Sequence, residues 1–225
     1  MKWVDVCGAP GSGKSTICDP IWGPHELAID NKLPQRQWHD FLNEITRLFI
    51  LIREHPSYVA AVRMNNRSIR KISTVARSED VDGRDTYIQT GLVQRGLGFG
   101  WRLNDLDIPL VELEHYFRLM PVSVGVAITN CPFDEIVKRN HDREKVKATA
   151  HENRDFMVAL MLPAIDVARR VLKDRGVPIL ELSTDGDPDE ARKQLIAFAA
   201  QKTTDAATDG RGCEVEVFSA PPWFL

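Results

Sequence analysis

Short apolar runs alternate along the chain with longer segments in which apolar residues recur every three or four positions. The short runs predict β-strands at residues 2–7, 26–30, 86–90, 121–128 and 177–182. The longer segments predict helices at residues 38–54, 57–77, 152–173 and 187–201. Alternation of this kind predicts a parallel sheet of five strands with helices on both faces, which is a three-layer α/β/α domain.

The chain shows no internal repeat and no interior linker, so we expect one domain over residues 1–201. Pro163 should kink or divide the helix at 152–173. Residues 202–225 form a C-terminal tail, small and polar at first and apolar from Cys213 to Leu225. The role of this tail stays open.

The amino-acid composition excludes several classes of protein. The 225 residues are 43% hydrophobic and 27% charged, which excludes a disordered or fibrous chain. The four cysteines form no C-x-x-C pair, so we expect neither a disulfide framework nor a zinc site. Such cysteines are typical of a protein in a reducing compartment. The sequence contains neither a signal-peptide pattern nor an apolar run of about 18 residues. We therefore expect a cytoplasmic protein without a membrane segment.

The net charge of −3 conceals two basic segments. Residues 61–78 contain five basic side chains and no acidic one, and residues 138–154 contain six basic and three acidic ones. The remainder of the chain is acidic. Basic segments on an acidic body predict that anions are bound at particular places.

One sequence motif, at residues 8–15, predicts a binding site for phosphate groups. The sequence Gly8-Ala9-Pro10-Gly11-Ser12-Gly13-Lys14-Ser15 fits the pattern G-x-x-x-x-G-K-[ST] and lies between a predicted strand and a helix, with Thr16 directly behind it. Backbone N–H groups in such a loop bind phosphates at the helix N-terminus. Lys14 should reach the β- and γ-phosphates of ATP, and the Ser15 hydroxyl should ligate Mg²⁺. The motif thus predicts a P-loop that binds nucleotide.

The other segments favour a kinase among P-loop proteins. The predicted strand at 86–90 ends in Gln89-Thr90, without the second carboxylate usual in motors and switches, and Asn31-Lys32 lacks the aspartate of a guanine-reading loop. Length and segment order instead resemble small P-loop kinases, which transfer the γ-phosphoryl group to a small acceptor. Because Gln89 removes a usual acidic group, a non-catalytic ATP-binding protein stays an alternative.

The resemblance to small kinases, phage polynucleotide kinases included, implies roles for further residues. Asp30, at the end of the predicted second strand, would be the base that accepts the proton of the acceptor hydroxyl, with Asp19 as its competitor. A lid at about 138–154 would bring Arg139 and Arg143 to the transferring phosphoryl group. The alternative for these arginines is a solvated charged helix. Residues 180–187 resemble the adenine-side loop of such enzymes.

Two further segments bear on the acceptor. At 100° per residue, one side of the predicted helix 57–77 carries an arginine stripe, which matches a row of phosphates unless it is only a solvated face. The stripe comprises Arg63, Arg67, Arg70 and Arg77, with Lys71 beside them. In residues 94–102 three alternating glycines surround Phe99 and Trp101. This pattern predicts a loop whose aromatic rings stack on a base, or else two core aromatics in a bent loop.

At this level of detail the chain to about residue 200 resembles the bacteriophage 5-hydroxymethyluracil DNA kinases. The resemblance is carried by residues 8–25, 29–34, 90–102 and 149–154. It implies a P-loop kinase fold with a small lid, Mg²⁺ and ATP as cofactors, and DNA containing 5-hydroxymethyluracil as the partner. The product would be a phosphorylated hydroxymethyl group in the phage genome, for downstream DNA-modifying enzymes to use. A kinase of free nucleosides or nucleotides is the alternative.

Overall fold

Four parallel strands form the centre of the molecule. A computed structural model describes residues 3–22, 35–53, 86–88, 91–121, 125–147 and 154–208. In these ranges the strands pair in the order β2-β1-β3-β4, all parallel. Their bounds are β1 Trp3–Gly8, β2 Thr86–Ile88, β3 Gly125–Asn130 and β4 Ile179–Ser183. Four of the five predicted strands are thus present, and the fifth, at 26–30, lies outside the described residues.

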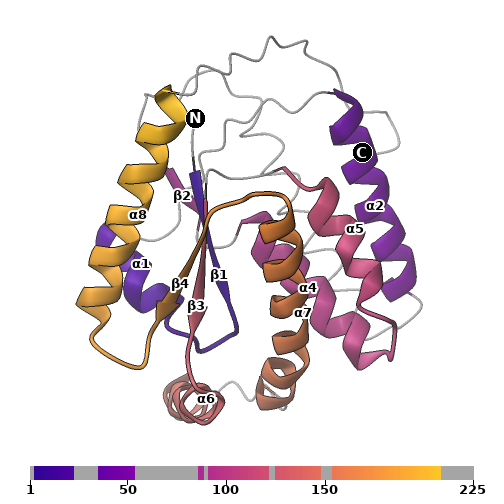
Figure 1. Cartoon of the computed structure of the whole chain (residues 1–225). Helices are drawn as coiled ribbons and strands as arrows, with labels where there is room; N and C mark the ends of the chain where they lie inside the picture. Colours follow the sequence, from indigo (N-terminus) through magenta and orange to yellow (C-terminus); the bar gives the residue numbers. More distant parts are fainter. Residues whose placement is uncertain are drawn as a thin grey trace.

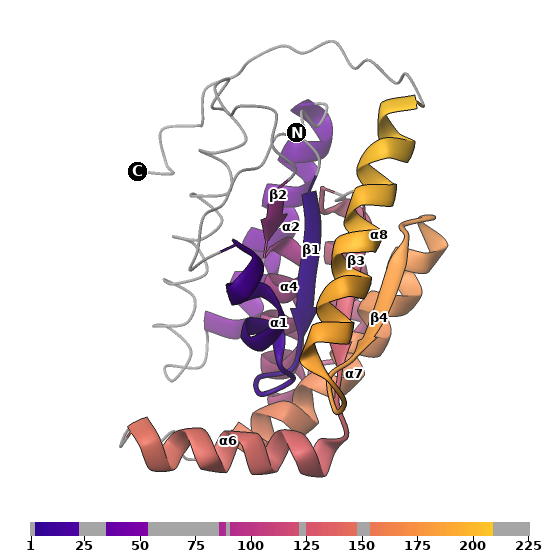
Figure 2. The ribbon, with the colours of Figure 1, turned by 90° about the vertical axis from the view of Figure 1, so that its left-hand side faces the viewer.

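Helices cover both faces of this sheet. On one face lie α1 (Lys14–Trp22) and α8 (Pro188–Thr208), and on the other lie α4 (Leu92–Asp105) and α7 (Arg154–Asp174) (Figure 1). Outside α4 and α7, α2 (Gln35–Arg53) and α5 (Val111–Leu119) add a further layer. α6 (Phe133–Lys147) runs across the carboxyl ends of the strands (Figure 2). The predicted α/β architecture is therefore confirmed.

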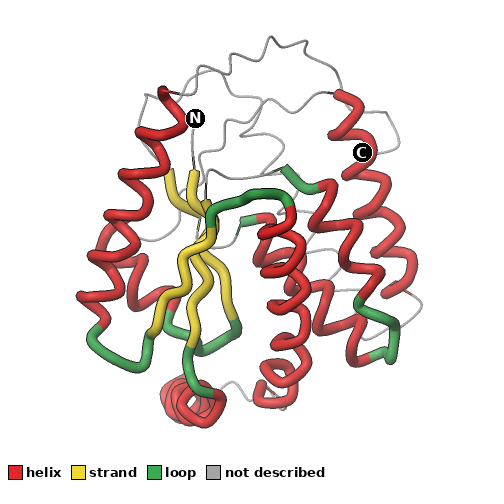
Figure 3. The backbone as a smooth tube through the Cα atoms, viewed as in Figure 1, coloured by secondary structure: helices red, strands yellow, loops and turns green. Residues whose placement is uncertain are grey.

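The apolar residues of the strands divide between two cores. Val4, Val6 and Ala127 pack with α1 and α8 on one side of the sheet. Val126 and Ile128 pack on the other side with the larger cluster from α2, α4, α5 and α7. Because β1 and β3 are covered on both faces, nearly all their residues are buried, as expected for central parallel strands. The loops that follow β1, β3 and β4 then meet at one edge of the sheet (Figure 3).

The segment 94–102 is a helix, so the predicted aromatic loop is wrong. Residues 94–102 all belong to α4, and its glycines are explained by close packing rather than by a bend. A Cβ at Gly96 would lie 2.6 Å from Tyr116 of α5, and one at Gly100 would lie 2.9 Å from Leu113 and closer still to Ala164 of α7. Tertiary packing therefore overrides the low helix propensity of glycine.

Two helices, α7 and α8, also differ from expectation. α7 is a single helix that Pro163 does not divide. Pro163 and Ala159 are both exposed, so the carbonyl that loses its partner can face water. α8 continues to Thr208, seven residues past the predicted end of the domain, so the first part of the predicted tail is helical.

Within the described part of the chain, none of the helices is both long and apolar enough to cross a membrane.

Candidate active site

The sequence motif forms a tight loop between β1 and α1. Gly11 and Gly13 both have φ of +86°, a conformation that glycine adopts without strain. The ammonium group of Lys14 donates to the carbonyl oxygens of Gly8 and Ala9, at 2.7 and 2.9 Å. α1 begins at Lys14, so the loop amides lie at a helix N-terminus, where anions are stabilised.

Polar side chains from four distant elements hold this loop in place. Gln94 of α4 accepts the Gly8 N–H at 3.0 Å, and Asn140 of α6 donates to the Pro10 carbonyl at 3.3 Å. Thr129 at the end of β3 bonds the Ser12 hydroxyl at 2.6 Å. Thr184, directly after β4, donates to the Ser12 carbonyl at 2.8 Å. The loop is therefore preorganised by contacts that do not involve a ligand.

These four residues were not among the predicted site residues. Thr129 and Thr184 lie at the carboxyl ends of β3 and β4, Gln94 lies in the first turn of α4, and Asn140 lies in the middle of α6. A polar residue at the carboxyl end of a parallel strand, as at Thr129 and Thr184, is the signal that the sequence offered. Asn140 is 2% exposed, and its amide group leaves room for no side chain at Gly11, since a Cβ there would lie 2.6 Å from Asn140 Oδ1.

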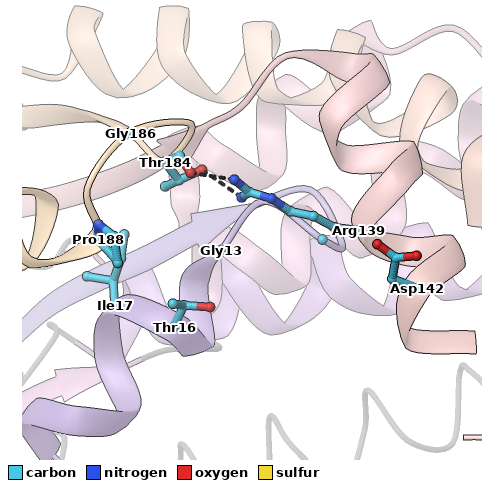
Figure 4. A pocket seen from close by; sticks show the side chains of 9 residues that line it. Gly13, Thr16, Ile17, Arg139, Asp142, Thr184, Gly186 and Pro188 are labelled. Atoms are coloured by element: carbon cyan, nitrogen blue, oxygen red, sulfur yellow. Dashed lines mark hydrogen bonds between the residues drawn. The ribbon is translucent and has the colours of Figure 1, made fainter. Parts of the chain in front are cut away.

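A pocket of about 340 Å³ opens beside the loop (Figure 4). It is lined by residues of the loop, α1, α6, the segment after β4 and the start of α8, namely Gly11, Gly13, Thr16, Ile17, Arg139, Asp142, Thr184, Gly186 and Pro188. Loop amides and a helix N-terminus are at one end, and the segment at 184–188 forms one wall. Such a cavity can hold a phosphate chain on the loop together with a ring in the pocket.

Arg139 reaches across this pocket. Its guanidinium group donates to the Thr184 carbonyl at 2.7 Å (Figure 4). It also donates to Glu135 of the same helix at 3.0 Å. The structure thus brings Arg139 next to the loop and to the segment predicted to contact adenine. In this arrangement the guanidinium faces the pocket wall at Thr184. The side chain of Arg143, further along α6, is outside the described part of the structure.

Several other predicted site residues lie outside the described residues. They are Asp30 and the arginine stripe of Arg63, Arg67, Arg70 and Arg77 with Lys71. Asp19 belongs to α1, but its side chain is not described. The structure therefore does not place the base or the stripe relative to the loop.

The two aromatic residues predicted to stack on bases have different surroundings. Phe99 is 1% exposed and packs edge-on against Phe49, with ring centroids 5.2 Å apart. Its prediction as a nucleic-acid contact is wrong, because the ring is enclosed in the core. Trp101 is only partly buried, and the guanidinium of Arg102 lies 4.4 Å from its ring centroid.

Asp5 is a buried carboxylate behind the loop. Its side chain is 1% exposed, and Oδ2 accepts the backbone N–H of Val93 at 2.9 Å. Burial raises the pKa of Asp5 to about 7, although the backbone N–H groups of residues 91–93 and the charge of Arg95 act to lower it. Asp5 therefore caps α4 from the neighbouring strand, since the N-cap residue Gly91 has no side chain to do so.

The raised pKa predicts a pH-dependent stability. Between about pH 4 and pH 7 the folded chain keeps a proton on Asp5 that the unfolded chain has lost, so the Asp5 contribution to folding stability falls as pH rises. Replacement by the neutral isostere in Asp5→Asn should remove this dependence. The difference in the free energy of unfolding between the variant and the original chain should therefore grow, in favour of the variant, by on the order of 4 kcal/mol between pH 4 and pH 7.

Urea unfolding at several pH values measures the difference between the two chains, in which other titrating groups cancel. A difference that stays constant with pH would contradict the raised pKa.

Comparisons with known proteins bear on the fold. No protein-family model and no curated protein matches the chain. The solved structure of deoxyadenosine kinase from M. mycoides with bound dATP is similar, with a TM-score of 0.52 at 10% identity, covering 88% of this chain and 99% of that one. Its structures with bound dCTP and with bound products have TM-scores of 0.49 and 0.47 at 11% identity. The dATP-bound structure identifies the α/β fold as that of a known kinase.

Proposed function

We propose that this chain is a kinase that uses Mg²⁺ and ATP to phosphorylate the hydroxymethyl group of 5-hydroxymethyluracil within DNA. The observation that carries the kinase assignment is the preorganised loop at 8–15 beside a pocket that can take a nucleotide base. The fold similarity to a deoxyadenosine kinase supports transfer to a nucleoside-like acceptor. The DNA substrate is supported by the sequence resemblance and by the arginine stripe.

The residues of the loop fit ATP and Mg²⁺. Glycine suits position 13, because its φ is +86° and a Cβ there would lie 3.1 Å from Thr184. Lys14 would hold the β- and γ-phosphates, and the base would lie against Thr16, Arg139 and Thr184. The Ser15 hydroxyl is a suitable oxygen ligand for Mg²⁺, which neutralises phosphate charge when bound.

In the proposed reaction the hydroxymethyl oxygen attacks the γ-phosphorus as the bond from that phosphorus to the β–γ bridging oxygen breaks. ADP leaves with the electron pair of that bond, and the hydroxyl proton passes to the carboxylate of Asp30. Arg139 and Arg143 of α6, the proposed lid, would neutralise charge on the moving phosphoryl group. Because Arg139 bonds the Thr184 carbonyl here, it would have to leave that bond to do so.

A kinase of free deoxynucleosides is the second candidate, and the fold similarity favours it. The two candidates differ in where the phosphate arrives. We would incubate the protein with Mg²⁺ and γ-labelled ATP against duplex DNA containing 5-hydroxymethyluracil, the same duplex with thymine, and the free nucleoside and its monophosphate.

Digestion of the DNA to nucleosides and mass analysis then locate the label. We expect phosphate on the hydroxymethyl group of the polymer and none on the thymine duplex. Label only on the free nucleoside or monophosphate would replace this proposal by the second candidate. ATP binding without transfer to any acceptor would indicate a non-catalytic ATP-binding protein.

A further inference from the structure

Gln94 connects the phosphate-binding loop to α4. Its Oε1 accepts the N–H of Gly8, the last residue of β1, at a distance of 3.0 Å. α4 lies on the face of the sheet opposite to α1 and α8, so this bond reaches the loop from the side away from the pocket. Gln94 thus makes a polar contact between the loop and the second face of the sheet, beside the apolar contact that Ala9 makes there.

The hydrogen bond to Gly8 fixes the orientation of the Gln94 amide. A backbone N–H needs an acceptor, so Oε1 must face Gly8 and Nε2 must face away from that N–H. Nε2 carries two hydrogens, and no acceptor for them is found among the described residues. The side chain is only partly buried, so these hydrogens remain available to a ligand.

The position of Lys14 shows which end of the loop would receive the terminal phosphate. The lysine ammonium lies on the carbonyls of Gly8 and Ala9, whereas the pocket adjoins Gly11, Gly13 and Thr16. A nucleotide with its base in the pocket would therefore have its terminal phosphate at the Gly8 end. That is the end where the Gln94 amide is bonded.

The first turn of α4 is held rigidly enough to position this amide. Asp5 accepts the N–H of Val93 at 2.9 Å, and the Tyr116 hydroxyl donates to the Leu92 carbonyl at 2.7 Å. Gly91 packs so closely on the Asp5 carboxylate that a Cβ there would lie 2.6 Å from its Cγ atom. Groups that act in a transition state need such support from packed neighbours.

We propose that Gln94 acts on the terminal phosphoryl group of the bound nucleotide. Its Oε1 positions the first loop amide, and its Nε2 donates to a terminal phosphoryl oxygen on the side away from the base pocket. The inference rests on the proposed nucleotide-binding function of the loop. It adds a hydrogen-bond donor from α4 to those supplied by the loop and by Lys14.

The variant Gln94→Glu separates the two atoms. A carboxylate keeps an acceptor for the Gly8 N–H but has no hydrogens to donate, and its charge repels a phosphate. We expect the preference for ATP over ADP, measured by calorimetry with Mg²⁺, to fall about tenfold or more. The melting temperature should stay within a few degrees of the original because the Gly8 bond is retained. Gln194→Glu, on the exposed side of α8, makes the same charge change away from the site and should leave the preference intact.

An unchanged ATP preference in Gln94→Glu would overturn the proposal and leave Gln94 with a structural role only. Should that variant fail to fold, Gln94→Met supplies a side chain of similar shape without polar atoms, and it too must lose ATP preference. The comparison of ATP and ADP binding needs no substrate that accepts a phosphoryl group. If the original protein binds ATP but phosphorylates nothing, the proposed kinase function fails, while the ATP-to-ADP ratio still decides the role of Gln94.

Discussion

Replacing Lys14 by methionine should lower the rate of phosphoryl transfer by at least about 10³-fold. The lysine ammonium is bonded to the carbonyls of Gly8 and Ala9, at the end of the loop where the terminal phosphate would lie. Methionine keeps much of the apolar stem but removes the charge that would stabilise the transferring group. Initial rates with labelled ATP and the preferred acceptor measure the effect.

The fold should survive this change, because the loop is also held by Gln94, Thr129, Asn140 and Thr184. Circular dichroism and the melting temperature check that expectation. Lys193→Met on α8 is a suitable control, since Lys193 is 76% exposed and lies outside the pocket. A Lys14→Met protein with more than a tenth of the original rate would contradict the assignment of the loop as the phosphate site.

Introducing a methyl group at Gly100 should destabilise the chain by about 3 kcal/mol or more. A Cβ there would overlap Ala164 of α7 and lie 2.9 Å from Leu113 of α5, and both neighbours are fully buried. Because α4 is packed between these two helices, it cannot move away from one without meeting the other. Urea unfolding of Gly100→Ala measures the loss.

Gly98→Ala is the matched control two residues away. A Cβ at Gly98 would meet nothing closer than Arg102 Nη1 at 3.6 Å, so alanine should stabilise the helix there by up to about 1 kcal/mol. Two identical substitutions in one helix should therefore have opposite signs. Equal effects at both positions would show that helix propensity rather than packing determines the glycine pattern.

Local sequence patterns predicted the parts of the structure that depend on neighbouring residues. The apolar run at 2–7 followed by the glycine-rich motif gave β1, the loop and the start of α1, since each follows from residues a few positions apart. The alternation of strands and helices gave the parallel sheet in the same way.

The residues that complete the site depend on contacts between distant segments. Gln94 lies in a segment whose glycines predict a loop, but the close contacts of these glycines with Tyr116, Leu113 and Ala164 are compatible with a helix. Thr184 is separated from Ser12 by 172 positions, and no local pattern shows that the two meet. The burial of Phe99 also depends on distant segments, since its ring packs against Phe49 of α2 and Tyr116 of α5.

The long-range bonds that hold the loop also bear on when it can form during synthesis. The loop is translated before all four of its partners, which lie 86, 117, 130 and 172 positions after the loop residues that they bond. Domains of this size fold as units while the chain emerges from the ribosome, and contacts of long sequence separation form late. Nucleotide affinity should therefore appear only after Thr184 has emerged, so that binding of ATP reports the completion of the sheet.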